Sequence, residues 1–314
     1  MTWLQDNTHH WGEWTVQGLV EAKGSQRVSL VVPARNEAAT LGPIVSRVRE
    51  ALMETTALLD EIVVIDSDST DATYEVADAA GATVYRAGEI RPDLGARRGK
   101  GEAMWKSQFV TSGDLIVFMD ADLVDWDTHF VPGLLGPLLH RGEVHLVKGF
   151  YARPGTEGPL DGGRVTELVA RPLLSLHRPE LADLVQPLAG EWAVRRDWFA
   201  SLEVPSGYGV EIAAVLDTHR RFGMAGLAQV DLGTRAHSHQ DLFDLGAMAT
   251  QVLAAALPRL GPVRHGLERD GATQVELRQF RSGREPVART VDLCERPPGR
   301  DHQTPHDARS SIRR

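Results

Sequence analysis

Cysteine is almost missing from this sequence. Cys294 is the single cysteine among 314 residues, which excludes a disulfide within the chain and fits a protein of the reducing cytosol. The first residues have neither the charged start nor the apolar core of a secretory signal, and no stretch reaches the roughly 18 apolar residues that a membrane span requires. We therefore expect a cytoplasmic protein that does not cross a membrane.

An excess of basic charge is also absent. The chain carries 34 Lys and Arg residues against 43 Asp and Glu residues, which gives a formal net charge of −9. Such a balance argues against bulk binding to nucleic acid. No internal repeat is present, and 42% hydrophobic content is sufficient for one large α/β domain or for such a domain with an appended lobe.

What the sequence does contain is a regular alternation of strand and helix patterns. The predicted strands are 28–32, 62–65, 83–85 and 115–119, and a helical pattern opens at Thr40. This alternation predicts a doubly wound, mostly parallel sheet flanked by helices, with right-handed crossovers. Polar segments follow the strands, so we expect them to gather at the carboxyl edge of the sheet, where open α/β folds bind ligands.

Two aspartates follow the last of these predicted strands. Asp120 and Asp122 flank Ala121 directly after the apolar run. A Mg²⁺ or Mn²⁺ ion in a phosphate site takes one or two carboxylates and completes its shell with water and phosphate oxygens. The pair therefore points to a transferase that acts on a sugar nucleotide, although a turn that caps a strand can produce the same short motif.

Longer motifs resemble a known family. Val-Val-Pro-Ala-Arg-Asn-Glu (31–37), Val-Ile-Asp-Ser-Asp-Ser-Thr-Asp (64–71) and the aspartate pair look like a GT-A glycosyltransferase. More specific are Gly-Lys-Gly-Glu-Ala-Met-Trp (99–105), His-Leu-Val-Lys-Gly-Phe-Tyr (145–151), residues 162–174, Gly-Tyr-Gly-Val-Glu-Ile (207–212) and Arg-Ala-His (235–237). These are similar to the actinobacterial glucosyl-3-phosphoglycerate synthases, retaining enzymes that transfer glucose from UDP-glucose to 3-phosphoglycerate. The resemblance covers residues 11–257 and implies a Rossmann-like GT-A fold with a C-terminal acceptor-binding lobe.

The resemblance implies a UDP-glucose site and a metal site. The implied donor-binding residues are Pro33, Ala34, Arg35, Asn36, Glu37, Ser67, Lys100, Asp120, Ala121, Tyr208, Gly209, Glu211 and Arg235. Lys100, Asp120 and Glu211 are expected at the catalytic centre, with Lys100 meeting phosphate at a glycine-flanked helix start that is not a Walker sequence. Asp122 and His237 would bind Mg²⁺ or Mn²⁺, although a lone histidine outside such a family is usually an ordinary polar residue.

The acceptor site is expected where a second helix begins. Gly163, Arg164, Val165 and Thr166 open a helical pattern, so backbone donors, helix dipole and guanidinium point at one spot. The resemblance assigns this spot to 3-phosphoglycerate, together with His239, which stands where the family typically has an asparagine. The alternative is a purely structural, glycine-bearing helix start with a solvated Arg164.

Composition and resemblance divide the chain into five segments. These are an N-terminal extension packed on the domain surface (1–24), a nucleotide-sugar-binding domain (25–153), a part that binds the acceptor and completes the active site (154–260), a C-terminal segment (261–294) and a disordered tail rich in Arg, Pro and Ser (295–314). Residues 154–163 are expected to form a flexible loop between the second and third segments.

Other functions fit parts of the same pattern. The nearest alternative is a mannosyl-3-phosphoglycerate synthase that uses GDP-mannose, and another is a nucleotide-sugar-binding protein without transfer activity. A nucleotidyltransferase is disfavoured because residues 33–37 are not a glycine-rich phosphate loop. The family is thought to transfer glucose by front-face attack without a protein nucleophile, and a homodimer is the family expectation.

Overall fold

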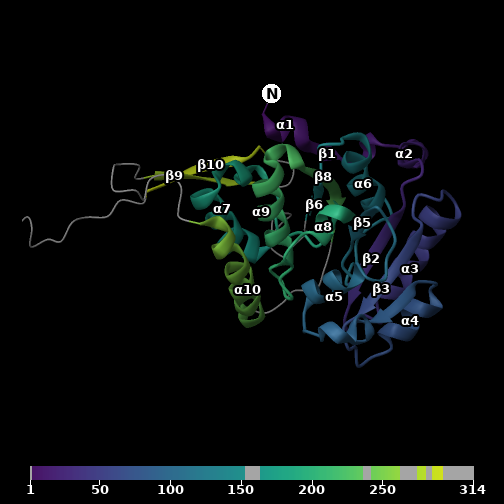
Figure 1. Cartoon of the computed structure of the whole chain (residues 1–314). Helices are drawn as coiled ribbons and strands as arrows, with labels where there is room; N and C mark the ends of the chain where they lie inside the picture. The colour runs from purple at the N-terminus through teal and green to yellow at the C-terminus, as the bar shows by residue number, and fades with distance from the viewer. Residues whose placement is uncertain (1, 153–162, 236–241, 262–273, 281–284, 293–314) are drawn as a thin grey trace, which may run out of the picture.

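The chain folds around one large twisted sheet covered by helices on both faces (Figure 1). The structure is a computed structural model, and it describes residues 2–152, 163–235, 242–261, 274–280 and 285–292. The strands of the main sheet lie in the order β1-β8-β6-β7-β5-β2-β3-β4. Within this sheet every strand runs in the same direction except β7, which is antiparallel to both β5 and β6. The predicted mostly parallel sheet flanked by helices is therefore confirmed.

The bounds of the elements are as follows. The main strands are β1 (Thr8–His10), β2 (Val28–Ala34), β3 (Glu61–Asp66), β4 (Thr83–Arg86), β5 (Leu115–Phe118), β6 (Leu146–Ala152), β7 (Trp192–Arg195) and β8 (Leu227–Thr234), and a separate hairpin is formed by β9 (Gln274–Gln279) and β10 (Val287–Asp292). The α-helices are α1 (Trp3–Asn7), α2 (Val16–Lys23), α3 (Leu41–Arg49), α4 (Thr73–Ala79), α5 (Lys100–Ser107), α6 (Phe130–His140), α7 (Arg171–His177), α8 (Arg196–Ala200), α9 (Val210–Phe222) and α10 (Leu242–Leu260). A π-helical turn, η5 (Thr166–Ala170), leads into α7.

Two hydrophobic cores form because alternate residues of a strand point to opposite faces of the sheet. Leu30 and Val32 of β2 enter the core built with α2, α3, α4 and α6. Val31 enters the other core, built with α5, α7, α8, α9 and α10. Both faces of a parallel sheet must be covered in this way, so most residues of the central strands are apolar. The arrangement leaves the carboxyl ends of the strands free to form a site.

All four predicted strands have slightly different ends in the structure, and β3 and β4 are longer than predicted. β2 continues through Pro33 to Ala34, and β5 stops at Phe118, before Met119. Pro33 has no N–H to donate, yet it pairs with Ile65 of β3. The pairing continues beyond it, because the Ala34 carbonyl accepts a hydrogen bond of 2.9 Å from the Ser67 N–H. The missing N–H of Pro33 is tolerated because Val32 and Ala34, on either side of it, are paired with β3.

The N-terminal segment extends the main sheet rather than lying only on the surface. β1 pairs in parallel with β8, with Thr8 opposite Gln229 and His10 opposite Asp231. Trp14 then packs on α6, where Gly136 leaves room for its ring. A Cβ atom at Gly136 would lie 2.3 Å from the indole, so glycine is required at this close approach. The sequence patterns of the segment did not predict this strand.

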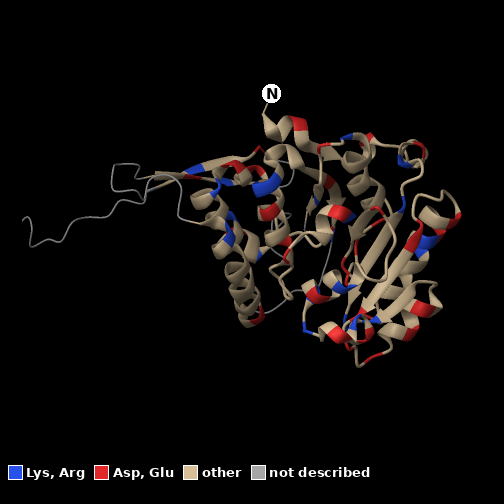
Figure 2. Cartoon of the chain, in the orientation of Figure 1, with Lys and Arg blue, Asp and Glu red and all other residues tan. Residues whose placement is uncertain are grey.

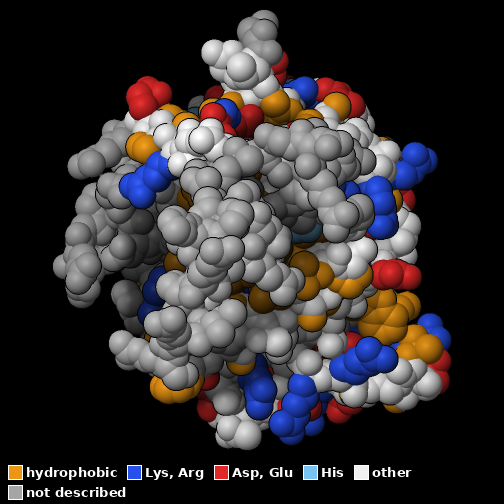
Figure 3. All heavy atoms as spheres, turned by 90° about the vertical axis from the view of Figure 1, so that its left-hand side faces the viewer, with side chains coloured by type: hydrophobic (Ala, Val, Ile, Leu, Met, Phe, Trp, Pro, Cys, Tyr) orange, Lys and Arg blue, Asp and Glu red, His pale blue; other side chains and the backbone are white. Residues whose placement is uncertain are grey.

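Helices α7 and α10 and the β9–β10 hairpin form a second lobe beside α9 (Figure 1). Figure 3 views the molecule from this side, where exposed apolar side chains lie beside acidic and basic ones. The described part of the chain contains no helix that combines the length and the apolar character needed to cross a membrane. The predicted tail, most of the predicted 154–163 loop and Cys294 lie outside the described residues, and the domain boundaries stay predictions.

Candidate active site

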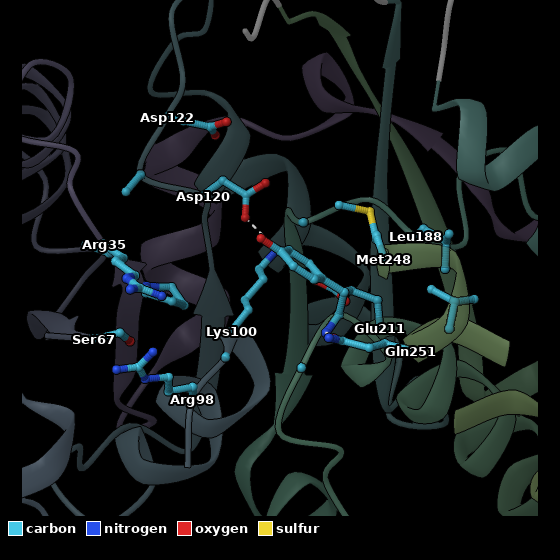
Figure 4. A pocket seen from close by; sticks show the side chains of 18 of the residues that line it. Arg35, Ser67, Arg98, Lys100, Asp120, Asp122, Leu188, Glu211, Met248 and Gln251 are labelled. Atoms are coloured by element: carbon cyan, nitrogen blue, oxygen red, sulfur yellow. Dashed lines mark hydrogen bonds and ion pairs between the residues drawn. The ribbon is translucent and has the colours of Figure 1, made fainter. Parts of the chain in front are cut away.

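A cavity of about 840 Å³ opens at the carboxyl edge of the sheet, between the ends of β2, β3 and β5 and the second lobe (Figure 4). Of the residues predicted to form the site, the structure brings together on its wall Pro33, Ala34, Arg35, Glu37, Ser67, Lys100, Asp120, Ala121, Asp122, Gly163, Arg164, Val165, Thr166, Tyr208, Glu211 and Arg235. The expected donor and acceptor residues therefore share one space. His237 and His239 lie outside the described residues.

Lys100 occupies the centre of the cavity. Its Nζ lies 2.6 Å from Oδ1 of Asp120 and 2.8 Å from Oε1 of Glu211 (Figure 4). Burial opposes the charge on Lys100, but the two carboxylates outweigh it and raise the pKa of the ammonium well above its usual value. Burial likewise opposes the charge on Asp120, but Lys100 and Arg235 hold the pKa of that carboxyl well below its usual range. Lys100 and Asp120 are therefore both charged at neutral pH.

Arg235 is a buried cation that ties four side chains together. Its Nη2 lies 3.1 Å from Oδ2 of Asp120 and 2.9 Å from Oδ1 of Asp122. Its Nη1 donates to Oε2 of Glu191 at 3.1 Å and to the Tyr151 hydroxyl at 2.6 Å. Burial disfavours the charge on Arg235, but the surrounding acids outweigh it and raise its pKa above the usual value. The guanidinium thus fixes the orientation of both aspartates.

The aspartate pair fits a hard divalent cation. The side chains of Asp120 and Asp122 are 20% and 35% exposed, and both face the cavity. No group of three or more His, Cys, Asp or Glu side chains that could hold a metal occurs within the described ranges. One or two carboxylates are nevertheless sufficient when a phosphate ligand and water complete the shell. Asp122, the more exposed of the two, is the better placed to bind such a cation.

One end of the cavity is formed by the loops after β2 and β3, with Arg35, Ser67 and Arg98 around it (Figure 4). Glu37 also lines this part. Its burial, and then the nearby charge of Asp122, raise the pKa of its carboxyl. Asn36 is not among the lining residues, and its side chain accepts a hydrogen bond from the Thr70 N–H at 2.8 Å and so joins the two loops.

The other end of the cavity is formed by the second lobe. Glu211 and Tyr208 come from the start of α9, Gly163 to Thr166 come from the start of η5, and α10 covers them. Gly209 lies just outside the wall, because it packs against Ala255 of α10. The residues of the predicted anion site, Gly163–Thr166, therefore line the same cavity as the loops after β2 and β3.

Sequence reasoning missed part of the wall. The additional lining residues are Asp68, Ala87, Gly88, Ala96, Arg97, Arg98, Gly99, Leu188, Gly190, Gly207, Leu245, Met248, Gln251 and Val252. Arg97 and Arg98 had a local signal, since they directly precede the Gly-Lys-Gly motif. The four lining residues on α10 had no such signal in the sequence, because the pattern of an amphipathic helix does not indicate which site the helix covers.

Basic side chains are concentrated at the cavity although the whole chain is acidic. Arg35, Arg97, Arg98, Lys100, Arg164 and Arg235 outnumber the acidic lining residues Glu37, Asp68, Asp120, Asp122 and Glu211. On the outer helices the charged residues of α3 are basic and those of α4 are acidic (Figure 2). The cavity wall is therefore less acidic than the chain as a whole, which favours an anionic ligand there.

Known proteins are similar to this chain in sequence and in fold. Residues 29–199 match glycosyl transferase family 2. The glucosyl-3-phosphoglycerate synthase of Mycolicibacterium smegmatis is 46% identical over 302 residues, which cover 94% of this chain and 96% of the relative. The crystal structure of the Mycobacterium tuberculosis enzyme with Mn²⁺, UDP-glucose and phosphoglyceric acid has a TM-score of 0.76 and 43% identity, and covers 95% of this chain and 99% of that one.

A second M. tuberculosis structure contains Mn²⁺, UDP and glucosyl-3-phosphoglycerate, with a TM-score of 0.75, 41% identity and the same coverage. These similarities extend over nearly the whole chain and agree with the arrangement of the cavity. This chain therefore belongs to glycosyl transferase family 2 and, within it, to the glucosyl-3-phosphoglycerate synthases.

Proposed function

We propose that this protein transfers glucose from UDP-glucose to 3-phospho-D-glycerate and thereby forms glucosyl-3-phosphoglycerate, with Mg²⁺ or Mn²⁺ bound. The observation that carries the proposal is the shared cavity, in which predicted donor and acceptor residues face each other across Lys100, Asp120 and Glu211. The relatives bound to UDP-glucose, phosphoglyceric acid and the glucosylated product support the same substrates.

The donor would lie along the cavity from the nucleotide-domain loops to α9. Pro33 to Glu37 and Ser67 would hold the uridine, with Glu37 facing the ribose. Lys100 would hold the diphosphate, because an ammonium at a helix N-terminus combines a full charge with free backbone N–H groups. Glu211 and Tyr208 would then meet the glucose, and the start of η5 would place the acceptor beside it.

Asp122, with Asp120 next to it and with His237 as the ligand implied by resemblance, would hold the metal ion. When bound, the ion supplies positive charge to the diphosphate as it leaves. Asp122 is now paired with Arg235 at 2.9 Å, so metal binding requires this guanidinium to share or release the carboxylate. The released guanidinium would remain close enough to pair with phosphate.

The transfer itself needs no protein nucleophile. The bond between C1 of glucose and the diphosphate oxygen breaks while the acceptor hydroxyl oxygen bonds to C1 from the same face, and the hydroxyl proton passes to the diphosphate. The glucosidic product keeps the donor's α configuration. The carboxylates of Glu211 and Asp120 both form ion pairs with Lys100. They are therefore better suited to position Lys100 and the sugar hydroxyl groups than to attack C1.

The test is the release of UDP under controlled omission. We expect release at a steady rate only when UDP-glucose, 3-phosphoglycerate and Mg²⁺ or Mn²⁺ are all present. Release without the acceptor would indicate hydrolysis, and no release with all three would contradict transfer and favour a binding protein. We further propose that the protein is cytoplasmic and that it forms a homodimer, as the family resemblance implies. Sedimentation equilibrium would test the homodimer.

A further inference from the structure

Helix α10 covers the Glu211 end of the cavity, and the proposed function assigns it no role. Its lining residues are Leu245, Met248, Gln251 and Val252, of which Gln251 alone is polar. Figure 4 shows Gln251 at the same end of the cavity as Glu211 and Met248, away from Arg35 and Ser67. Gln251 is exposed and lines the cavity, so a ligand that enters this end can reach its amide.

The orientation of the Gln251 amide is fixed by chemistry. Its Oε1 lies 2.8 Å from the backbone nitrogen of Tyr208. Because a backbone N–H can only donate, the amide oxygen must face Tyr208, and the NH₂ group is turned away from it. The chain makes room for this contact at Gly207, where a Cβ atom would lie only 1.9 Å from Oε1. Glycine at 207 and glutamine at 251 therefore act as a matched pair.

The NH₂ group of Gln251 is left with donors to offer. Within the part of the chain that the structure describes, no protein acceptor lies within hydrogen-bond distance of it. The other lining residues of α10, Leu245, Met248 and Val252, carry no hydrogen-bond donor in their side chains. A glucose ring at this end of the cavity would present hydroxyl oxygens, which are acceptors for such a group.

We propose that Gln251 is a specificity-determining residue for the donor sugar. Its NH₂ group donates to one hydroxyl oxygen of the glucose, while its amide oxygen holds the turn that precedes α9 and so positions Glu211. The proposal rests on UDP-glucose being the donor, as proposed above. The acceptor is the less suitable partner, because its negative charges match Arg164 and the η5 start rather than a neutral amide among apolar side chains.

Three variants separate the two roles of the amide. Gln251→Glu keeps an oxygen that can accept from Tyr208 but loses the donor, whereas Gln251→Met loses both. Thr250→Ala is the matched control, because Thr250 neighbours Gln251 on α10, is exposed and bonds only to Gly246 of its own helix. Dissociation constants for UDP-glucose and for UDP are measured by calorimetry with Mn²⁺ present. UDP binding reports any effect of charge or metal on the diphosphate, which both ligands share. The dissociation constant for UDP-glucose divided by that for UDP therefore isolates the contribution of the sugar.

We expect this ratio to rise about threefold to tenfold in both Gln251 variants, as for the loss of one hydrogen bond, and to stay unchanged in Thr250→Ala. The turnover number should fall further in Gln251→Met than in Gln251→Glu, because only the former releases the turn. Among UDP-glucose analogues that lack a single sugar hydroxyl, one should bind with the same affinity to the wild type and to Gln251→Met, and that analogue identifies the hydroxyl.

An unchanged ratio in both variants would overturn the proposal, as would an equal response of every deoxy analogue or an effect confined to the KM for 3-phosphoglycerate. The binding ratio does not depend on turnover. A wild type that binds UDP-glucose but fails to transfer glucose would therefore contradict the proposed function while leaving the Gln251 contact supported.

Discussion

The ammonium of Lys100 on α5 lies 2.8 Å from the carboxylate of Glu211 on α9, and this ion pair joins the two sides of the cavity. Lys100 begins α5, whereas Glu211 lies in the first turn of α9, next to α10 of the second lobe. Because Lys100 also binds Asp120, any movement of α9 disturbs the aspartate pair. The proposed phosphate and sugar subsites are in this way coupled through the Lys100 side chain.

Glu211→Gln should therefore lower kcat without trapping glucose on the enzyme. The substitution replaces an ion pair with a neutral contact, and the loss of a charge-assisted hydrogen bond costs about 1.5–3 kcal/mol. Steady-state kinetics gives the size of the effect, and intact-protein mass spectrometry detects any adduct. A glucosyl adduct on Glu211, in either the wild type or the variant, would contradict front-face transfer.

Asp122→Ala should abolish transfer, and His237→Ala should weaken it severely. Each substitution removes a predicted metal ligand, and the charge that the metal supplies to the leaving group is worth several kcal/mol. Asp127→Ala is the control, because Asp127 is an exposed aspartate that pairs with Arg47 on the surface. Circular dichroism should show that all three variants fold. Near-normal turnover by Asp122→Ala in the presence of a chelator would show that the reaction needs no metal at this site.

Arg164→Ala and Thr166→Ala should raise the KM for 3-phosphoglycerate far more than the KM for UDP-glucose. Both residues line the cavity at the η5 start, and a lost contact to phosphate or carboxylate costs about 1.5–3 kcal/mol. Varying each substrate at a saturating concentration of the other separates the two constants. Equal changes in both constants, or no change, would mean that this helix start is structural.

Much of the fold and of the site could be predicted because the signals are local. A strand followed by a polar loop is visible within a few residues, as in the run that ends at Asp120 and Asp122. Contacts between distant segments left no such signal. The antiparallel insertion of β7, the pairing of β1 with β8 and the approach of Gln251 to Gly207 depend on how segments far apart in the chain meet. Arg235 was placed at the donor by resemblance, but its ion pairs with Asp122 and Glu191 appear only in the structure.

Lys148 on β6 predicts how stability changes with pH. It is fully buried and donates a hydrogen bond to the Ala189 carbonyl. Burial, only partly offset by the nearby carboxylates of Glu211, Glu191 and Asp120, lowers its pKa from 10.5 to about 8. Between these two values the unfolded chain binds more protons at this residue than the folded chain does. The free energy of unfolding should therefore gain up to about 1.4 kcal/mol per pH unit from Lys148 in this window.

The comparison with Lys148→Met isolates this contribution. Urea unfolding of both proteins at several pH values from 7 to about 10.5 gives the difference in unfolding free energy at each pH. The wild type should gain stability relative to the variant above about pH 8 and show no relative change below it. A difference that stays constant across the whole range would show that the folded-state pKa of Lys148 is close to its ordinary value.

The identity and configuration of the product test the central claim most directly. The protein is incubated with 3-phosphoglycerate and Mg²⁺ or Mn²⁺, with UDP-glucose and GDP-mannose offered in separate reactions and in competition. Mass spectrometry identifies the product, and the anomeric proton resonance gives its configuration. We predict an α-linked glucosyl-3-phosphoglycerate formed from UDP-glucose, with UDP a better inhibitor than GDP, since a pocket built for uracil leaves groups unpaired around a purine. A β-linked product would contradict retention, and a preference for GDP-mannose would contradict the assigned donor.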